Sequence, residues 1–435
     1  MKRITIHTLL TVLFTAVTSL VCAQSPSSPN DGCDLHRTRL IPYPTADAAA
    51  AHAMTKQRYM QPITEWSQPS EGTLRGEFTY PFSWVERQIF LRIEHVGCPY
   101  EVRINGKRAG GSTNGFGAAE YNITKLSRED KNSVEIRLLK SDDVAAIECF
   151  KGSETTLPDV YIISQPRVRV RDIFYHTTLG GDNSANVSFG VVMHNETLGN
   201  KVSRIYYDVY LNDTLRLVSG QRDVSLGMRG VDTMRFGATV ADTMLWSDRS
   251  PVRISLRLKN RVEGRDVEFY DMPVALREVE YADGGFTINR QATDVVWRDM
   301  SPNVEVADVD NAYAGGCRAI RFTAGEVRDE VLSRCDELGV YVAVTAPINS
   351  WLSGTSRKRG KNPSNNPKWR ADYVERTLQM AHTVKRHPSV IALFLADESS
   401  NGICLYESYL ALKRIAGDLP VFYKDGGGEW NSDLL

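Results

Sequence analysis

Apolar and polar residues alternate in short stretches over the first part of the chain. Residues 88–93, 100–104 and 133–138 have the length and the β-branched or aromatic content of strands, and Asn105-Gly106 is typical of a two-residue hairpin turn. This pattern predicts a β-sandwich or a jelly roll over residues 24–165.

The same alternation continues further along the chain. It is found in residues 185–192, 205–211 and 252–258, again separated by turn-forming residues. These strands predict a second β-sandwich over residues 166–282.

Near Gly284 the pattern changes to alternating strands and helices. Apolar residues between Val327 and Leu338 recur with helical spacing, and Gly339 is placed to end that helix. The elements expected here are a helix over 327–338, a strand over 340–344, a helix over 366–386, a strand over 390–395, a helix over 403–416 and a strand over 421–423. Such βα alternation predicts a parallel sheet with short crossovers over residues 283–435.

Composition and charge narrow the classes of function. The 435 residues are 42% hydrophobic and 24% charged, as expected for a globular protein of two to four domains. The formal net charge of -1 argues against nucleic acid or an anionic membrane surface as a partner.

The N-terminus has the features of an export signal. Lys2 and Arg3 precede an apolar run over residues 4–21, and residues 21–23 read V-C-A, which fits a cleavage site. We therefore expect a signal peptide over residues 1–23 and a periplasmic or extracellular mature protein. Lipid modification of Cys22 is the alternative, but the bulky residue before it disfavours this. No other segment is long and apolar enough to be expected to span a bilayer.

The cysteines suggest neither zinc nor a defined disulfide framework. None of the six that follow the predicted signal peptide forms a C-x-x-C pair, and Cys335 falls on the core-facing side of a helix, where a buried free thiol is usual. We expect no metal and no other cofactor. The six are Cys33, Cys98, Cys149, Cys317, Cys335 and Cys404.

Several motifs resemble those of one enzyme family. Residues 102–107 read V-R-I-N-G-K, residues 121–124 read Y-N-I-T, and residues 245–247 read L-W-S. In the βα region, residues 318–321 read R-A-I-R, 335–342 read C-D-E-L-G-V-Y-V, and 387–391 read H-P-S-V-I. In their order and spacing they are similar to motifs of glycoside hydrolase family 2, which includes β-galactosidases, β-glucuronidases and β-mannosidases.

This resemblance implies a fold and a chemistry. The fold would be a jelly-roll, sugar-binding-like domain, an immunoglobulin-like sandwich and then a (β/α)8 TIM barrel. The chemistry would be retaining hydrolysis of an oligo- or polysaccharide by two carboxylates. The H-P-S-V-I strand of the family ends in G-N-E, whose Glu is the general acid/base, and Glu398 occupies that position. Glu398 also follows an apolar strand, on the face where barrel enzymes place their sites. A solvated charge that helps to start the next helix is the other interpretation.

The positions around Glu398 depart from the family. Asp397 replaces an Asn that contacts the sugar, and an ionised Asp can only accept hydrogen bonds. Arg321 matches a family Arg and is expected either to bind substrate or to pair with a carboxylate at a strand end. The family's His is replaced by Ala324, and its acidic positions after the third strand by Thr345 and Asn349, so we do not expect its metal site here.

The family's nucleophile lies on the seventh barrel strand, whereas residues 421–423 correspond to the fifth and the sequence stops at Leu435. We therefore expect an incomplete barrel without its nucleophile. Asp425 and Glu429 follow the fifth strand and could in principle approach Glu398, although carboxylates in turns are usually solvated. Five strands would leave two unpaired edges and an open apolar interior, which predicts aggregation, a partner chain or a homo-oligomer.

Aromatic residues offer binding surfaces for sugars. Trp351 and Trp430 are expected to bind substrate and Trp369 lies beside the same loops, whereas Trp84 and Trp246 are expected in cores. The basic run over residues 357–361 is either a solvated loop or a means of steering an acidic glycan.

Three functions remain open on the sequence alone. The first is a β-galactosidase-like glycoside hydrolase with Glu398 as acid/base, and the second is a non-catalytic glycan-binding relative. The third is a fragment of such an enzyme from an interrupted gene.

Overall fold

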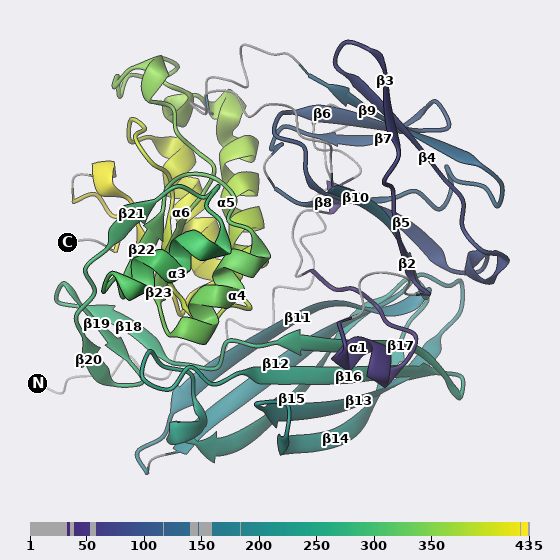
Figure 1. Ribbon diagram of the computed structural model, residues 1–435, viewed down its shortest axis with the longest axis horizontal. Helices are drawn as coiled ribbons and strands as arrows, with labels where there is room; N and C mark the ends of the chain where they lie inside the picture. The colour runs from purple at the N-terminus through teal and green to yellow at the C-terminus, as the bar shows by residue number, and fades with distance from the viewer. Residues whose placement is uncertain are drawn as a thin grey trace, which may run out of the picture.

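The computed structural model describes residues 33–34, 39–52, 58–115, 117–139, 147, 159–182, 184–426 and 428–433, and only the backbone of residues 33–34. These residues form three domains that pack against one another. The first, in purple and blue, lies at the right of Figure 1, the second, in teal, at the bottom, and the third, in green and yellow, at the left. The predicted signal peptide, Cys149 and the side chain of Cys33 lie outside the described residues.

Two five-stranded sheets form the first domain. Its strands are β1 (Cys33–Asp34), β2 (Met60–Pro62), β3 (Trp66–Ser70), β4 (Thr73–Phe78), β5 (Gln88–His95), β6 (Tyr100–Ile104), β7 (Lys107–Ser112), β8 (Ala119–Asn122), β9 (Asn132–Leu138) and β10 (Asp159–Gln165). They pair in the orders β1-β8-β5-β10-β2 and β3-β4-β9-β6-β7. The predicted strands lie within β5, β6 and β9. Asn105 and Gly106 have φ of 51° and 78°, the left-handed region that a tight hairpin turn requires.

A three-stranded and a four-stranded antiparallel sheet form the second domain, in the orders β11-β12-β15 and β14-β13-β16-β17. The strands are β11 (Val168–Leu179), β12 (Ser184–Asn195), β13 (Lys201–Leu211), β14 (Leu215–Leu226), β15 (Val231–Ala241), β16 (Ile254–Val262) and β17 (Arg265–Pro273), and α1 (Ala46–Ala50) packs on β17. Alternate residues of the facing strands form one apolar core between the two sheets.

The third domain is built on a parallel sheet in the order β21-β22-β23-β24-β25. Its elements are β18 (Val279–Ala282), β19 (Gly285–Ile288), β20 (Gln291–Thr293), β21 (Arg298–Met300), α3 (Val306–Ala314), β22 (Ala319–Phe322), α4 (Asp329–Leu338), β23 (Tyr341–Thr345), α5 (Arg370–Val384), β24 (Val390–Phe394), α6 (Ile403–Ile415) and β25 (Val421–Phe422). Every residue of β23 and β24 is buried, as expected for parallel strands covered on both faces. Gly339 ends α4 with φ of 70°, and a Cβ there would lie 2.4 Å from the Asp248 carbonyl oxygen.

Local segments lie against one end and one edge of this parallel sheet. The small antiparallel sheet β18-β19-β20 brings Tyr281 onto Phe422, with ring centroids 4.8 Å apart, and Phe422 also contacts Phe394 at 5.3 Å. At the β25 edge, Val421 accepts a hydrogen bond from the Asp433 amide and donates one to its carboxylate, at 2.8 and 2.7 Å. These contacts cover Phe422 and part of the β25 edge, since exposed aromatic rings and strand edges gain free energy when local segments lie against them. β21 and β25 remain the outermost strands of the sheet, and the incomplete barrel stays a prediction.

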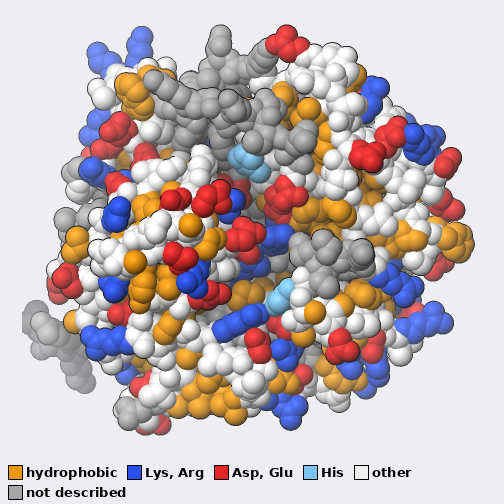
Figure 2. Space-filling model, viewed as in Figure 1, with side chains coloured by type: hydrophobic (Ala, Val, Ile, Leu, Met, Phe, Trp, Pro, Cys, Tyr) orange, Lys and Arg blue, Asp and Glu red, His pale blue; other side chains and the backbone are white. Residues whose placement is uncertain are grey.

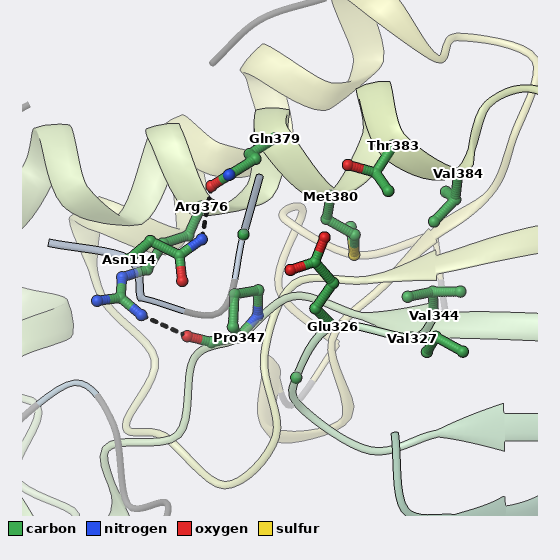
Figure 3. Close-up of a pocket in the computed structure, with 12 residues that line it drawn as sticks. Asn114, Glu326, Val327, Val344, Pro347, Arg376, Gln379, Met380, Thr383 and Val384 are labelled. Atoms are coloured by element: carbon green, nitrogen blue, oxygen red, sulfur yellow. Dashed lines mark hydrogen bonds between the residues drawn. The ribbon is translucent and has the colours of Figure 1, made fainter. Parts of the chain in front are cut away.

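The first domain docks on α5 through its loop before β8. Asn114 Nδ2 donates to Gln379 Oε1 at 2.5 Å, and Arg376 donates to the Thr113 and Pro347 carbonyl oxygens. Figure 3 shows the Asn114–Gln379 and Arg376–Pro347 hydrogen bonds beside the side chain of Glu326, which points toward Met380. Burial raises the pKa of Glu326 well above its usual value, so this interface contains an acid that favours its neutral form.

The H-P-S-V-I and C-D-E-L-G motifs meet below the sheet, at the start of β24. The Asp336 carboxylate accepts hydrogen bonds from the Ser389 amide at 3.0 Å, from its hydroxyl at 2.6 Å and from His387 Nδ1 at 2.7 Å. His387 Nε2 lies 3.1 Å from Asp329 Oδ1. Trp246, buried as predicted, donates to the Asp336 carbonyl oxygen, and Cys335 is a buried free thiol as predicted. These motif residues therefore stabilise the packing of strand and helix.

We predict that His387 makes stability depend on pH. Burial disfavours the charged imidazole, but Asp336 and Asp329 outweigh it and raise the pKa of His387 to about 9. Because the folded pKa exceeds the unfolded value, this contribution, about 3 kcal/mol, is complete below pH 6.5 and is lost as pH rises through 9. Urea unfolding of the wild type and of His387→Gln should differ most near pH 6 and progressively less up to pH 9.5.

The control is Ser389→Ala, which removes a donor that does not titrate and should lower stability equally across this range. A difference between wild type and His387→Gln that stays constant from pH 6 to 9.5 would show that His387 is not held in its charged form.

Candidate functional site at the strand ends

Charged side chains from three strands meet at the carboxyl ends of the parallel sheet. Arg321 at the end of β22 donates from Nε and Nη2 to the two carboxylate oxygens of Asp299 on β21, at 2.8 and 2.6 Å. Its Nη1 donates to Asp397 Oδ1 beyond β24, at 2.8 Å. The guanidinium carbon also lies 5.2 Å from the centroid of the Phe394 ring. From the end of β22, Arg321 therefore links β21 on one side to the segment after β24 on the other, and its side chain reaches across the end of β23 to do so.

The surroundings of the two carboxylates differ. The side chains of Arg321 and Asp397 are 13% and 16% exposed, whereas that of Asp299 is 56% exposed. The hydrogen bond from Arg321 lowers the pKa of Asp299. Hydrogen bonds to Asp299 and Asp397 raise the pKa of Arg321 despite its partial burial. Of the two roles considered for Arg321, the structure shows pairing with carboxylates.

Asp397 has a partner for each carboxylate oxygen. Oδ1 accepts from Arg321, and Oδ2 accepts from the backbone amide of Ala324 at 2.6 Å. Two donors thus face one side chain, and a carboxylate supplies an acceptor oxygen for each of them, which gives a physical reason for an acid at this position. Asp397, which was expected to contact substrate, therefore has both carboxylate oxygens hydrogen-bonded to groups of the protein itself.

Glu398 is held by its backbone while its side chain stays exposed. Its carbonyl oxygen accepts from the Ser350 amide at 3.1 Å, and the next residue, Ser399, contacts Ser350 and Asp425. Among the described residues, the Glu398 carboxylate has no hydrogen-bond partner. The partial burial considered from the sequence is thus absent for the Glu398 side chain, although the next residues, Ser399 and Ser400, are buried.

The two candidate tryptophans are both exposed. Trp351 is 50% exposed and directly follows Ser350, which contacts the Glu398 segment. Trp430 is 80% exposed and lies edge-on to the ring of Tyr406, with centroids 5.7 Å apart. Trp369, by contrast, is buried in the core and offers no sugar-binding surface.

Carboxylates from the chain segment after β25 are also engaged. Glu429 accepts from the Tyr406 hydroxyl at 2.7 Å and pairs with Arg357 at 3.3 Å. Asp425 Oδ2 accepts from the Ser399 amide at 3.4 Å. Asp425 is therefore hydrogen-bonded to Ser399, the residue that follows Glu398 in sequence. Glu429 is instead paired with Arg357, in the loop after β23.

Sequence reasoning missed Asp299. It lies on the three-residue strand β21, which is too short to show alternation. The signal that could have suggested it is spacing: Asp299 precedes Arg321 by 22 residues, a separation long enough for one crossover between neighbouring parallel strands.

Two cavities lie elsewhere in the described part of the molecule. One is the small space beside Glu326, and the other is a cleft of about 560 Å³ at the junction of the three domains, lined by residues that include Arg39, Asp271 and Arg386. Neither is lined by Arg321, Asp397 or Glu398. Within the described ranges no cluster of three or more His, Cys, Asp or Glu is arranged to hold a metal, and no helix has the length and apolarity to cross a membrane.

Comparison with known proteins identifies the third domain. Residues 298–433 match the family model of the glycosyl hydrolases family 2, TIM barrel domain. The beta-galactosidase of Priestia megaterium is 23% identical over 376 residues, which cover 80% of this chain and 36% of that protein. The beta-galactosidase of Vibrio cholerae is 24% identical over 379 residues, covering 82% and 36%. The chain thus spans about a third of the length of these curated relatives.

Solved structures show the same fold. A Bacteroides uniformis beta-glucuronidase aligns with a TM-score of 0.67 at 17% identity, covering 86% of this chain and 47% of that one. A glycosyl hydrolase family 2 member from Bacteroides cellulosilyticus aligns with a TM-score of 0.67 at 15% identity, covering 81% and 47%. These comparisons confirm the resemblance inferred from the motifs: residues 298–433 match the TIM barrel domain of the glycosyl hydrolases family 2, and the solved structures share the fold of the chain.

We predict that Arg321 and Asp299 contribute unequally to stability. Arg321→Met leaves the mostly buried Asp397 without its cation and should lower the free energy of unfolding by about 2 kcal/mol. Asp299→Asn removes an exposed partner and should cost less than about 1 kcal/mol. Urea unfolding at pH 7 measures both. Equal losses, or a larger loss for Asp299→Asn, would mean that burial of Asp397 does not set the strength of this cluster.

Proposed function

We propose that this protein is a glycoside hydrolase of the β-galactosidase-like type in which Glu398 acts as the general acid/base. The observation that carries the proposal is the position of Glu398, which presents an exposed carboxylate at the carboxyl end of β24 in a domain that matches the family's barrel. The curated relatives are named beta-galactosidases, which supports an O-glycoside as substrate.

A retaining mechanism sets a second requirement. Glu398 would protonate the leaving oxygen, while a nucleophilic carboxylate about 5 to 5.5 Å away attacks the sugar. Three carboxylates reach this face from the described strands, and each is engaged: Asp299 and Asp397 by Arg321, and Asp425 by the Ser399 amide. We propose that Glu398 works with a nucleophile that these five strands do not carry.

A non-catalytic glycan-binding function is the second candidate. The observation that favours it is the ion pair between Arg321 and Asp397, since it occupies two side chains expected to contact substrate. Trp351 and Trp430 remain exposed for stacking against sugar rings. Binding would then need neither proton transfer nor a nucleophile.

We also propose that the mature protein acts in the periplasm or outside the cell, after removal of residues 1–23. The first domain would be the jelly-roll, sugar-binding-like module and the second the immunoglobulin-like sandwich of the family arrangement. We further propose that a partner chain or a second copy of this chain packs on the third domain.

The proposed activity predicts the behaviour of Glu398→Gln. With aryl β-galactosides, β-glucosides and β-glucuronides, the variant should lose turnover by about 10²- to 10⁴-fold, because Gln cannot donate the proton. Initial rates of the full chain measure this. Glu337→Gln is the matched control, since Glu337 is 65% exposed and pairs with Arg334 at the end of α4.

A wild type that binds glycans without turnover would favour the second function. Equal rates for wild type and Glu398→Gln would exclude Glu398 as the acid/base.

A further inference from the structure

The loop after β23 is strongly positively charged. Residues 346–370 contain six Lys and Arg residues and no Asp or Glu, although the whole chain has a net charge of -1. In Figure 1 this light-green loop projects at the upper left, and Lys and Arg side chains gather at the same corner in Figure 2. The positive charge is therefore a local feature of one loop.

Hydrogen bonds attach this loop to the segment that carries Glu398. The Ser350 amide donates to the Glu398 carbonyl oxygen at 3.1 Å, Ser400 Oγ donates to the Thr355 carbonyl oxygen at 3.1 Å, and Asn365 Nδ2 donates to that of Asn401 at 3.0 Å. Short helical turns, η6 (Trp351–Ser353) and η7 (Pro363–Asn365), give the loop a defined path. The positive loop thus borders the candidate site.

Three of its cations are available to a ligand. Arg357 pairs with Glu429 and Arg370 with Glu407. The side chains of Lys358, Arg359 and Lys361 are exposed, and no carboxylate among the described residues pairs with them. Clustered like charges without counter-ions repel one another, and binding an anion would relieve that repulsion.

The same loop presents Trp351, which is 50% exposed and follows the residue that contacts Glu398. An aromatic face binds the apolar side of a sugar ring, while Lys and Arg bind carboxylate or sulfate groups. A neutral galactoside uses only the first of these. An acidic glycan uses both.

We propose that the ligand of this site is an acidic glycan, whose carboxylate or sulfate groups are bound by Lys358, Arg359 and Lys361 while a neighbouring ring stacks on Trp351. This inference rests on the proposed function, because it takes the strand ends as the sugar site. It adds the substrate class, which the positions of Arg321, Asp397 and Glu398 do not define.

The test measures binding of the full chain to three polysaccharides by calorimetry in 50 mM salt. Unsulfated chondroitin offers carboxylates, chondroitin sulfate offers both groups, and a β-1,4-galactan offers neither. The triple variant Lys358→Ser, Arg359→Ser, Lys361→Ser should lose affinity for the acidic glycans by about tenfold, with galactan binding unchanged. If the triple variant loses affinity for both chondroitins alike, the bound group is the carboxylate. If it loses affinity for the sulfated form alone, the bound group is the sulfate.

A matched control is the triple variant Arg222→Ser, Arg235→Ser, Arg265→Ser, which removes the same charge from exposed positions of the second domain. It should bind like the wild type. Trp351→Ala should lower the affinity for each of the three polysaccharides that the wild type binds, because the stacking surface for the sugar ring is lost.

Galactan binding equal to chondroitin binding in the wild type would overturn the proposal. Equal losses in the two triple variants, or equally tight binding of a DNA duplex, would overturn it as well, since the effect would then be one of general charge. Turnover of neutral aryl glycosides without acidic preference contradicts only this inference. Acidic-glycan binding without turnover contradicts only the catalytic part of the proposed function.

Discussion

The ends of three parallel strands are tied together by one guanidinium group. Arg321 binds Asp299 with two hydrogen bonds and Asp397 with a third, over the ring of Phe394. Apolar strands explain why the cluster lies here, because charged side chains can reach water only where a buried strand ends. With Asp397 fixed on one side and the Ser350 amide on the other, the Glu398 backbone has little freedom, although its carboxylate has no partner among the described residues.

Much of the third domain could be predicted from its sequence because its signals are local. The strands over 340–344 and 390–395 are continuous apolar runs, as buried parallel strands require, and they coincide with β23 and β24 within one residue at each end. Gly339 ends α4 as expected, since its left-handed backbone favours glycine. The hairpin at Asn105 and the burial of Trp84, Trp246 and Cys335 followed from equally local patterns.

Contacts between distant segments could not be predicted in the same way. The pair of Arg321 with Asp299 joins residues 22 positions apart, and nothing in either neighbourhood specifies the other. Glu398 was placed on the correct strand end, but its exposure depends on which segments lie over it. Covering of Phe422 by Tyr281 and of the β25 edge by Asp433 also depends on the assembled fold. The sequence therefore allowed burial to be predicted, whereas it did not allow the ion-pair partners of individual charged residues to be predicted.

A crystal structure of the full chain with a β-linked oligosaccharide would test most directly whether the strand ends form a sugar site. We expect a sugar ring on Trp351 and a glycosidic oxygen within hydrogen-bond distance of the Glu398 carboxylate. The Arg321 cluster should remain as it is in the free protein. An oligosaccharide bound only elsewhere, for example on the first domain or in the cleft between the domains, with no density beside Glu398, would contradict this assignment.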